Sequence, residues 1–148
     1  LAFSGMRLGE AIRIVWREVD FERGYFVVSG GPVGTKNRET RIVPLFPVLR
    51  GFLKELRASR TEASQDARLI RIESAKKAMI TACRNAALPH FTHHCMRHYF
   101  VSNAIEKGVD FKTIAAWVGH KDGGLLVAKT YGHLRDLHSY EMAKRMTG

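Results

Sequence analysis

Residues 92–108 read THHCMRHYFVSNAIEKG, and this stretch predicts the helix around which the rest of the chain is organised. His94 and Arg97 lie three positions apart, so on a helix they face the same way, one turn apart. Two side chains that can carry positive charge therefore share a patch beside Met96 and Phe100. This patch is either a solvated helix face or a place where an anion binds.

The segments around this stretch predict a mostly helical chain with a small β element near its start. Further helices are expected within residues 6–16, 47–59, 74–88, 110–120, 125–134 and 136–146. Two β-branched and aromatic runs, GYFVVS at 24–29 and TRIVPL at 40–45, flank a glycine-rich stretch and predict a hairpin with a long tip. The expected fold class is mostly α with a small antiparallel β-hairpin or sheet, an α+β fold.

The first two of these helices are expected to be amphipathic. Ser4 and Gly5 are expected to begin the first helix. The apolar sides comprise Ile12, Val15 and Trp16 in the first helix, where they are expected to be buried, and Val48, Phe52 and Leu56 in the second.

The composition favours a globular protein that binds a polyanion. The chain has 148 residues, 45% of them hydrophobic and 26% charged, which is enough to bury a core. Its 24 Lys and Arg against 14 Asp and Glu give a net charge of +10, for which nucleic acid is the expected partner. The alternatives are a merely solubilising surface and, with less support, an anionic membrane surface.

Three other features of the chain bear on its context. The opening LAFSGMRLGEAIRIVW is typical of the middle of a folded unit, so we expect that upstream sequence is missing. Cys83 and Cys95 lie far apart and outside any CxxC pattern, which favours a reducing, intracellular setting. No apolar run approaches the roughly 20 residues of a membrane span, so no membrane partner is expected.

Arg7 and Glu10 form the first candidate site. Arg7 is expected in the first turn of its helix, where a cation opposes the helix dipole at a cost of about 0.3–1 kcal/mol. Such a placement is reasonable if an anion binds at the helix start. Glu10, three positions on, can hold the guanidinium group. The alternative is an exposed Arg–Glu surface pair.

Three further residues have ordinary explanations when each is taken alone. Lys36, on the glycine-rich tip, is then a solvated lysine, although such a tip can reach a DNA groove and deliver a proton. His120 is then a helix C-terminal cap, and Tyr131 a half-buried aromatic residue.

His90, His94 and His98 recur every four positions, a spacing that can bind zinc. No carboxylate joins them in an HExxH pattern, and Cys95 points away from the His94 face. A metal site is therefore disfavoured, and His93 and His98 are expected to be packing or surface residues.

Taken together, five segments resemble the successive signatures of the tyrosine recombinases, the phage-integrase family. They are SGMRLGEA, TKNRETRIVPL, HHCMRH, WVGHKDGG and KTYGHL, and they extend from Ser4 to about Leu134. The resemblance implies the tyrosine-recombinase catalytic-domain fold over residues 1–148, N-terminally truncated. The start of that domain and an upstream core-binding domain would then be missing.

The resemblance also implies a catalytic set and a chemistry. The implied set is Arg7, Lys36, His94, Arg97, His120 and the nucleophile Tyr131, with Glu10 as the acidic companion of Arg7. Tyr131 would form a 3′-phosphotyrosyl link, His94 would accept its proton directly or through ordering, and Lys36 would protonate the 5′ oxygen. Arg7, Arg97 and His120 would bind the phosphate. No cofactor and no metal ion is required.

Some assignments leave competitors. Tyr99 and Tyr140 lack the KTYGHL context, and Lys121 and Lys129 lie near enough to compete with Lys36.

The implied partners are double-stranded DNA attachment sites and a homo-tetramer on DNA, with a monomer or weak oligomer without it. The implied location is the cytoplasm. The helix at 136–146 would dock on its own domain or on a neighbouring protomer. The alternatives to a recombinase are a non-catalytic DNA-binding relative of the same fold, a type IB topoisomerase and, last, a metal-dependent nuclease.

Overall fold

The structure is a computed structural model that describes residues 1–30, 40–60, 64–132 and 143–144. Its helices are α1 (Leu8–Ala11), α2 (Pro47–Ala58), α3 (Lys76–Asn85), α4 (His93–Glu106), α5 (Phe111–Val118) and α6 (Leu125–Tyr131). Its strands are β1 (Val19–Asp20), β2 (Tyr25–Val28) and β3 (Arg41–Pro44), preceded by a short 3₁₀ helix at Trp16–Glu18. The strands form one antiparallel sheet in the order β1-β2-β3, so the expected fold class is confirmed.

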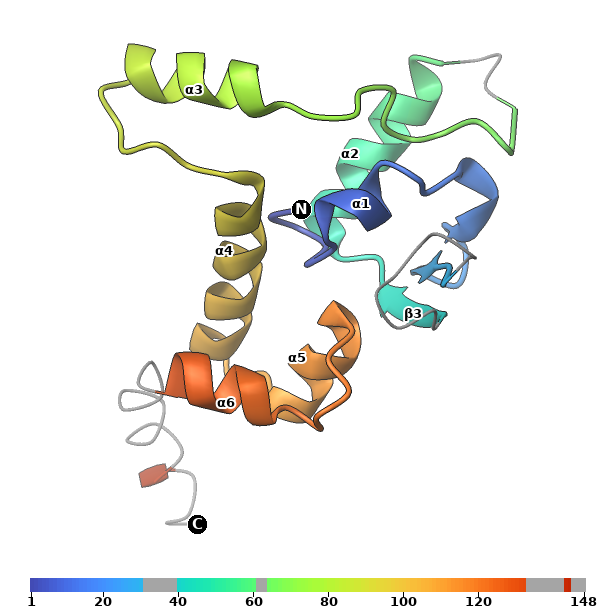
Figure 1. The fold of residues 1–148 in the computed structure, drawn as a ribbon. Helices are drawn as coiled ribbons and strands as arrows, with labels where there is room; N and C mark the ends of the chain where they lie inside the picture. The colour runs from blue at the N-terminus through green and yellow to red at the C-terminus, as the bar shows by residue number, and fades with distance from the viewer. Residues whose placement is uncertain (31–39, 61–63, 133–142, 145–148) are drawn as a thin grey trace.

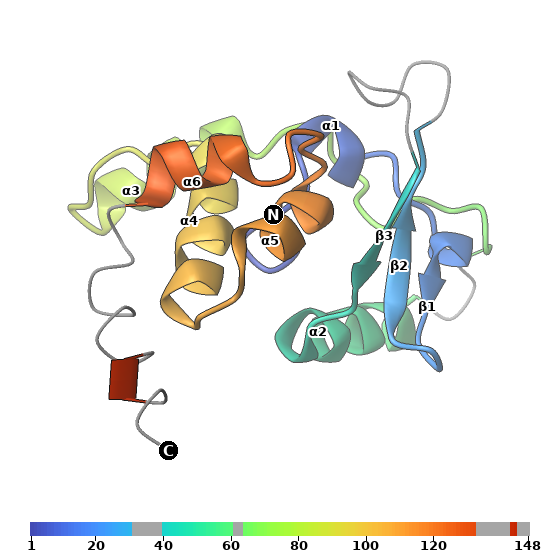
Figure 2. The same cartoon turned by 90° about the horizontal axis from the view of Figure 1, so that it is seen from below.

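The elements form two parts that meet around α1 (Figures 1 and 2). In one part the sheet packs on α2 over a core that includes Phe26 and Val43; in the other, α4, α5 and α6 enclose Ile114. Phe46 and Trp117 pack against both cores, and their rings meet edge to face at 5.1 Å. The helix α3 stands apart in Figure 1, and none of its residues is buried.

The helices at the centre of the sequence prediction begin where short polar side chains cap them. The hydroxyl of Thr92 accepts the backbone N–H of Cys95 at 3.3 Å, and the carboxylate of Asp110 accepts that of Thr113 at 2.8 Å. The helices predicted within residues 92–108 and 110–120 are therefore confirmed as α4 and α5.

The first helix is much shorter than the helix expected within residues 6–16. Neither Ser4 nor Gly5 begins it: Arg7 is its N-terminal flanking residue, and Gly5 has a left-handed φ of +63°. After Ala11 the N–H groups of Arg13 and Ile14 still donate to the carbonyl of Glu10, but from Ile14 onward the chain pairs with a distant segment.

One such contact is the backbone N–H of Trp16, which donates to the carbonyl of Ala67 at 3.2 Å. Of the side expected to be buried, Trp16 is only 1% exposed, whereas Ile12 and Val15 are partly exposed. A contact between residues this far apart in sequence cannot be predicted from local periodicity.

The helix α2 has the expected range but a different inward side. Leu53 is buried, whereas Val48 and Phe52 are 61% and 59% exposed. Leu49 and Leu56 are partly buried against the core of the sheet, so of the predicted apolar side only Leu56 faces inward. The sequence contains two apolar stripes on this helix, and the one with Leu49, Leu53 and Leu56 packs against the core.

Several sequence predictions fall outside the described residues, namely the hairpin tip with Lys36 and nearly all of the expected helix at 136–146. Within the described part of the chain, every helix is too short or too polar to cross a membrane.

The sheet offers a direct test of this packing. Val43 is 0% exposed, while its neighbour Ile42 is 62% exposed on the opposite face of β3. We expect Val43→Ala to lower the free energy of unfolding by about 2 kcal/mol, because two buried methyl groups are lost. Ile42→Ala should change it by less than about 0.5 kcal/mol. Urea unfolding of both variants measures the difference, and equal losses would contradict the assigned faces.

Candidate active site

The C-terminal end of α5 is the point at which the candidate residues meet. Gly119 follows the helix with φ of +70°, and its N–H donates to the carbonyl of Ala116 at 3.3 Å. The N–H of His120 donates to the carbonyl of Ala115 at 2.9 Å. This Schellman arrangement satisfies two of the four carbonyls that a helix end leaves open. The other two accept from arginine side chains.

Three arginines from different parts of the chain bind these two carbonyls. Nε of Arg41 donates to the carbonyl of Trp117 at 2.9 Å. The carbonyl of Val118 accepts from Nη1 of Arg7 at 3.4 Å and from Nη2 of Arg97 at 2.7 Å. A helix C-terminus carries partial negative charge and therefore favours cations. Because Arg7 and Arg97 share one acceptor, their guanidinium groups lie next to each other.

Glu10 is the carboxylate of this cluster. Its side chain is only 2% exposed and accepts two hydrogen bonds from Arg41, at 3.0 and 2.7 Å. It also accepts from the backbone N–H of Arg7 at 2.8 Å and from Nη1 of Arg7 at 3.2 Å. Burial alone would raise the pKa of Glu10, but the hydrogen bonds and charges of Arg41 and Arg7 outweigh it and lower this pKa. The Arg7–Glu10 pair is therefore not the exposed surface pair considered from the sequence.

Arg97 is buried, with 6% of its surface exposed. Its Nη1 donates to the carbonyl of Gly5, and its Nη2 donates to Val118 and faces Nε2 of His120 at 3.2 Å. Burial and the charge of Arg7 lower the pKa of Arg97 to about 10, so the guanidinium is still charged at neutral pH. Among the described residues these contacts use three of its five N–H groups, which leaves two for a ligand.

His120 is held in one neutral form by its surroundings. Burial and the charges of Arg97 and Arg7 lower its pKa. Because Arg97 donates to Nε2, the proton of the neutral ring lies on Nδ1, which is buried and has no partner among the described residues. Nδ1 is thus a free donor close to the arginines.

A cavity of about 170 Å³ adjoins Arg97. Its lining includes His94, Arg97 and His98 on α4, His120 after α5, and Thr130 and Tyr131 at the end of α6. Four residues of the predicted catalytic set therefore lie around one cavity. Arg7 reaches the same place through the carbonyl that it shares with Arg97.

Two residues of this site were not predicted from the sequence. Arg41 had no assigned role, although it lies on β3 two positions before Val43, which is buried. A charged residue on the inward face of a strand indicates a buried partner of opposite charge, so the alternation could have identified it. His98, expected to be a packing or surface residue, is bonded through Nδ1 to the hydroxyl of Tyr131.

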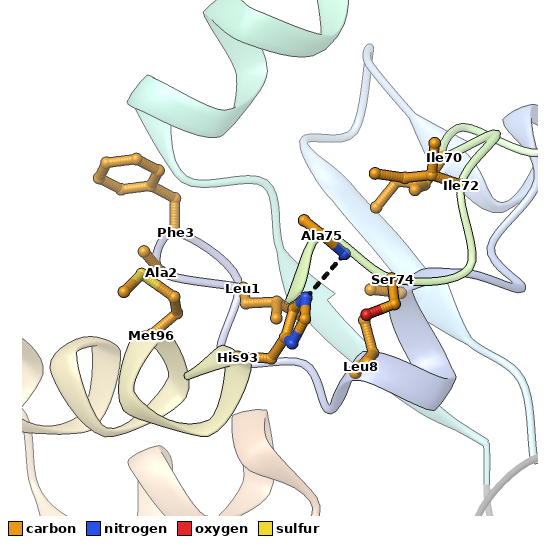
Figure 3. A pocket seen from close by; sticks show the side chains of 11 residues that line it. Leu1, Ala2, Phe3, Leu8, Ile70, Ile72, Ser74, Ala75, His93 and Met96 are labelled. Atoms are coloured by element: carbon orange, nitrogen blue, oxygen red, sulfur yellow. Dashed lines mark hydrogen bonds between the residues drawn. The ribbon is translucent and has the colours of Figure 1, made fainter. Parts of the chain in front are cut away.

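The remaining histidines do not complete a metal site. Within the described ranges, no group of three or more His, Cys, Asp or Glu residues could hold a metal ion. The rings of His94 and His98 meet edge to face at 4.4 Å. His93 instead lines a separate, mostly apolar cavity of about 310 Å³ with Leu1 and Met96, and its Nε2 accepts the N–H of Ala75 at 3.1 Å (Figure 3).

This arrangement suits an anion next to a tyrosine hydroxyl. Two guanidinium groups bind one carboxylate and a third, that of Arg97, lies beside them at the carbonyl of Val118, so positive charge remains uncompensated in a partly buried place. Arg7 is the accessible member: its side chain is 41% exposed, and its Nε and Nη2 have no partner among the described residues. Planar groups with several donors suit the oxygens of a phosphate.

Comparisons with known proteins agree with this chemistry. The family model described as "Phage integrase family" matches residues 1–138. The tyrosine recombinase XerA of Thermococcus onnurineus (strain NA1) is 28% identical over 127 residues, covering 80% of this chain and 44% of the relative. The chain thus spans less than half the length of this relative.

Solved structures show the same fold. A crystal structure of XerA recombinase has a TM-score of 0.74 at 21% identity, covering 99% of this chain and 55% of that one. The Tn1549 transposon integrase in complex with circular intermediate DNA has a TM-score of 0.75 at 18% identity, covering 99% and 57%.

The ion pair of Arg41 and Glu10 can be tested by its contribution to stability. We expect Arg41→Met to lower the free energy of unfolding by about 3 kcal/mol, because the buried carboxylate of Glu10 loses its bidentate partner. The control is Arg17→Met, which removes a pair with Asp66 whose side chains are 66% and 67% exposed and should cost about 0–1 kcal/mol. Denaturant unfolding measures both; a loss at Arg41 no larger than at Arg17 would contradict the central place of this pair.

Proposed function

The chain belongs to the phage integrase family, and on this premise we propose that it is the catalytic domain of a site-specific DNA recombinase or integrase. It would cleave and rejoin DNA strands through a 3′-phosphotyrosyl intermediate. The observation that carries the proposal is the cluster of Arg7, Arg41 and Arg97 at Glu10 and the end of α5, beside the cavity that Tyr131 lines. The positive charge of the cluster would bind a phosphodiester, and Tyr131, which lines the cavity, would be the nucleophile.

In this proposal Arg7, Arg97 and His120 bind the scissile phosphate. Negative charge gathers on the non-bridging oxygens as the phosphorus becomes pentavalent, and donors fixed in advance stabilise it without reorganisation. Arg7 offers the donors that it does not use on Glu10 and Val118. Arg97 is held by Gly5 and Val118, so its remaining donors have a fixed direction.

The strand transfer itself is an exchange of two phosphorus–oxygen bonds. The hydroxyl oxygen of Tyr131 attacks the phosphorus, the bond to the 5′ oxygen breaks, and the phosphotyrosyl link conserves the bond energy for rejoining. Lys36 protonates the departing 5′ oxygen. His94 accepts the tyrosine proton directly or orders the group that accepts it. The positive side chains serve in place of metal ions, so neither metal nor nucleotide cofactor takes part.

The proposal extends to the protein that carries this domain. The start of the catalytic domain and a core-binding domain would precede residue 1, and double-stranded attachment sites in the cytoplasm would be the substrate. The Tn1549 integrase, which has the same fold, is described in complex with circular intermediate DNA. On DNA we expect a homo-tetramer, and without DNA a monomer or weak oligomer. A non-catalytic relative is disfavoured because Tyr131 and both arginines are present, and a type IB topoisomerase because of the compact spacing.

The nucleophile can be identified with a nicked attachment-site oligonucleotide that traps the covalent intermediate. We expect the full-length protein to form an adduct resistant to denaturing electrophoresis, also in the presence of a chelator. Tyr131→Phe should abolish the adduct, since the attacking oxygen is gone. Tyr99→Phe is the matched control, because Tyr99 is 53% exposed and does not line the cavity, and should retain it. An adduct that persists in Tyr131→Phe would place the nucleophile elsewhere.

Arg7 can be tested in the same assay. We expect Arg7→Lys to lower the cleavage rate constant about 10²–10³-fold, because lysine lacks the planar fork of donors that suits the transition state. Non-specific DNA binding and thermal stability should change little. Arg17→Lys, on an exposed surface, should cleave at the parent rate. A drop in DNA affinity that matches the drop in rate would make Arg7 an anchoring residue instead.

A further inference from the structure

Among the described residues, His98 is the side chain that holds the hydroxyl of Tyr131. Its Nδ1 is bonded to the tyrosine oxygen, and the two ring centroids lie 5.6 Å apart. His94, one turn earlier on α4, contacts the edge of the His98 ring and so restricts its rotation. His98 thus lies between His94 and Tyr131 and contacts both.

The charge state of His98 suits an acceptor. Burial, and then the neighbouring His94 and Arg97, lower its pKa, so the ring is mostly neutral at pH 7. The other titratable groups around the same cavity are Tyr131 on α6 and His120 after α5. A neutral ring with its proton on Nε2 presents a lone pair at Nδ1. The tyrosine then donates its single proton to that nitrogen and keeps an oxygen lone pair for attack.

The position of His98 also couples the nucleophile to the phosphate site. Arg97 and His98 are adjacent on α4, so one rigid helix carries both an arginine of the anion site and the partner of the tyrosine. The end of α6 bearing Tyr131 is fixed against this helix through the same contact.

We propose that His98 is a further catalytic residue, which binds the hydroxyl of Tyr131 and takes its proton as the oxygen–phosphorus bond forms. The inference rests on the proposed function. The bond from Tyr131 to phosphorus forms, the bond from phosphorus to the 5′ oxygen breaks, and the tyrosine proton passes to Nδ1 of His98. The 5′ oxygen receives its proton from Lys36. His94 then acts through His98, by orienting its ring.

The test uses single-turnover cleavage by the full-length protein on a trapping oligonucleotide with a 5′-bridging sulfur at the scissile phosphate. A thiolate leaves without a proton, so the role of Lys36 is removed from the measurement. The variants are His98→Ala, His98→Asn and, as matched control, His90→Ala. His90 is exposed in the loop before α4 and does not line the cavity.

At pH 7 we expect His98→Ala to cleave about 10²-fold more slowly than the parent, with unchanged DNA affinity. His98→Asn should be similarly slow, because an amide oxygen accepts a hydrogen bond but no proton. Both defects should shrink as the pH rises towards about 10, the reference pKa of tyrosine, since hydroxide then removes the proton. The parent rate should fall as the pH drops through the lowered pKa of His98, because a protonated ring accepts nothing.

Three results would overturn the inference: parent-like cleavage by His98→Ala at pH 7, parent-like cleavage by His98→Asn, or a defect that is the same at every pH. The last would mean that His98 only supports the structure. Failure of the proposed function is distinguishable, because the parent itself would then form no adduct, or Tyr131→Phe would still form one.

Discussion

The structure depends on how the C-terminal end of α5 satisfies its last carbonyl groups. Two are closed by the chain itself, and the other two, of Trp117 and Val118, bind arginines that arrive from before α1, from β3 and from α4. Burying several like charges together is unfavourable unless partners of opposite sign are present. The helix end and the carboxylate of Glu10 supply that compensation only in part. The remaining positive charge suits the anion that the proposed function places here.

Much of the fold could be predicted because its signals are local. The helices α4 and α5 begin directly after Thr92 and Asp110, which cap the first turn, and the hairpin strands are β-branched runs on either side of a glycine-rich stretch. The first helix was predicted too long because the last residues of the predicted range hydrogen-bond to a distant segment, as the bond between Trp16 and Ala67 illustrates. Where tertiary contacts compete with helix periodicity, the sequence pattern alone cannot show which one prevails.

The site could be predicted only through the order of its motifs. His94 and Arg97 share a helix, so their proximity follows from spacing, and Glu10 contacts Arg7 as a pair three positions apart should. The meeting of Arg7 with Val118 spans 111 positions, and no local rule implies it. The alternation of β3 places Arg41 on the inward face but does not name Glu10 as its partner, and His98 was missed because its partner is on another helix.

The long separations in this cluster have a consequence for biosynthesis. Arg7 and Arg41 meet their carbonyl partners 111 and 76 positions later in the chain, so residues 117 and 118 must be synthesised before these two bonds can form. A polypeptide truncated earlier carries every upstream arginine yet lacks the helix end that gathers them. The contacts of Arg7 and Arg41 with Glu10 need no residue of α5, so this part of the cluster can form first and the bonds to Trp117 and Val118 complete it later.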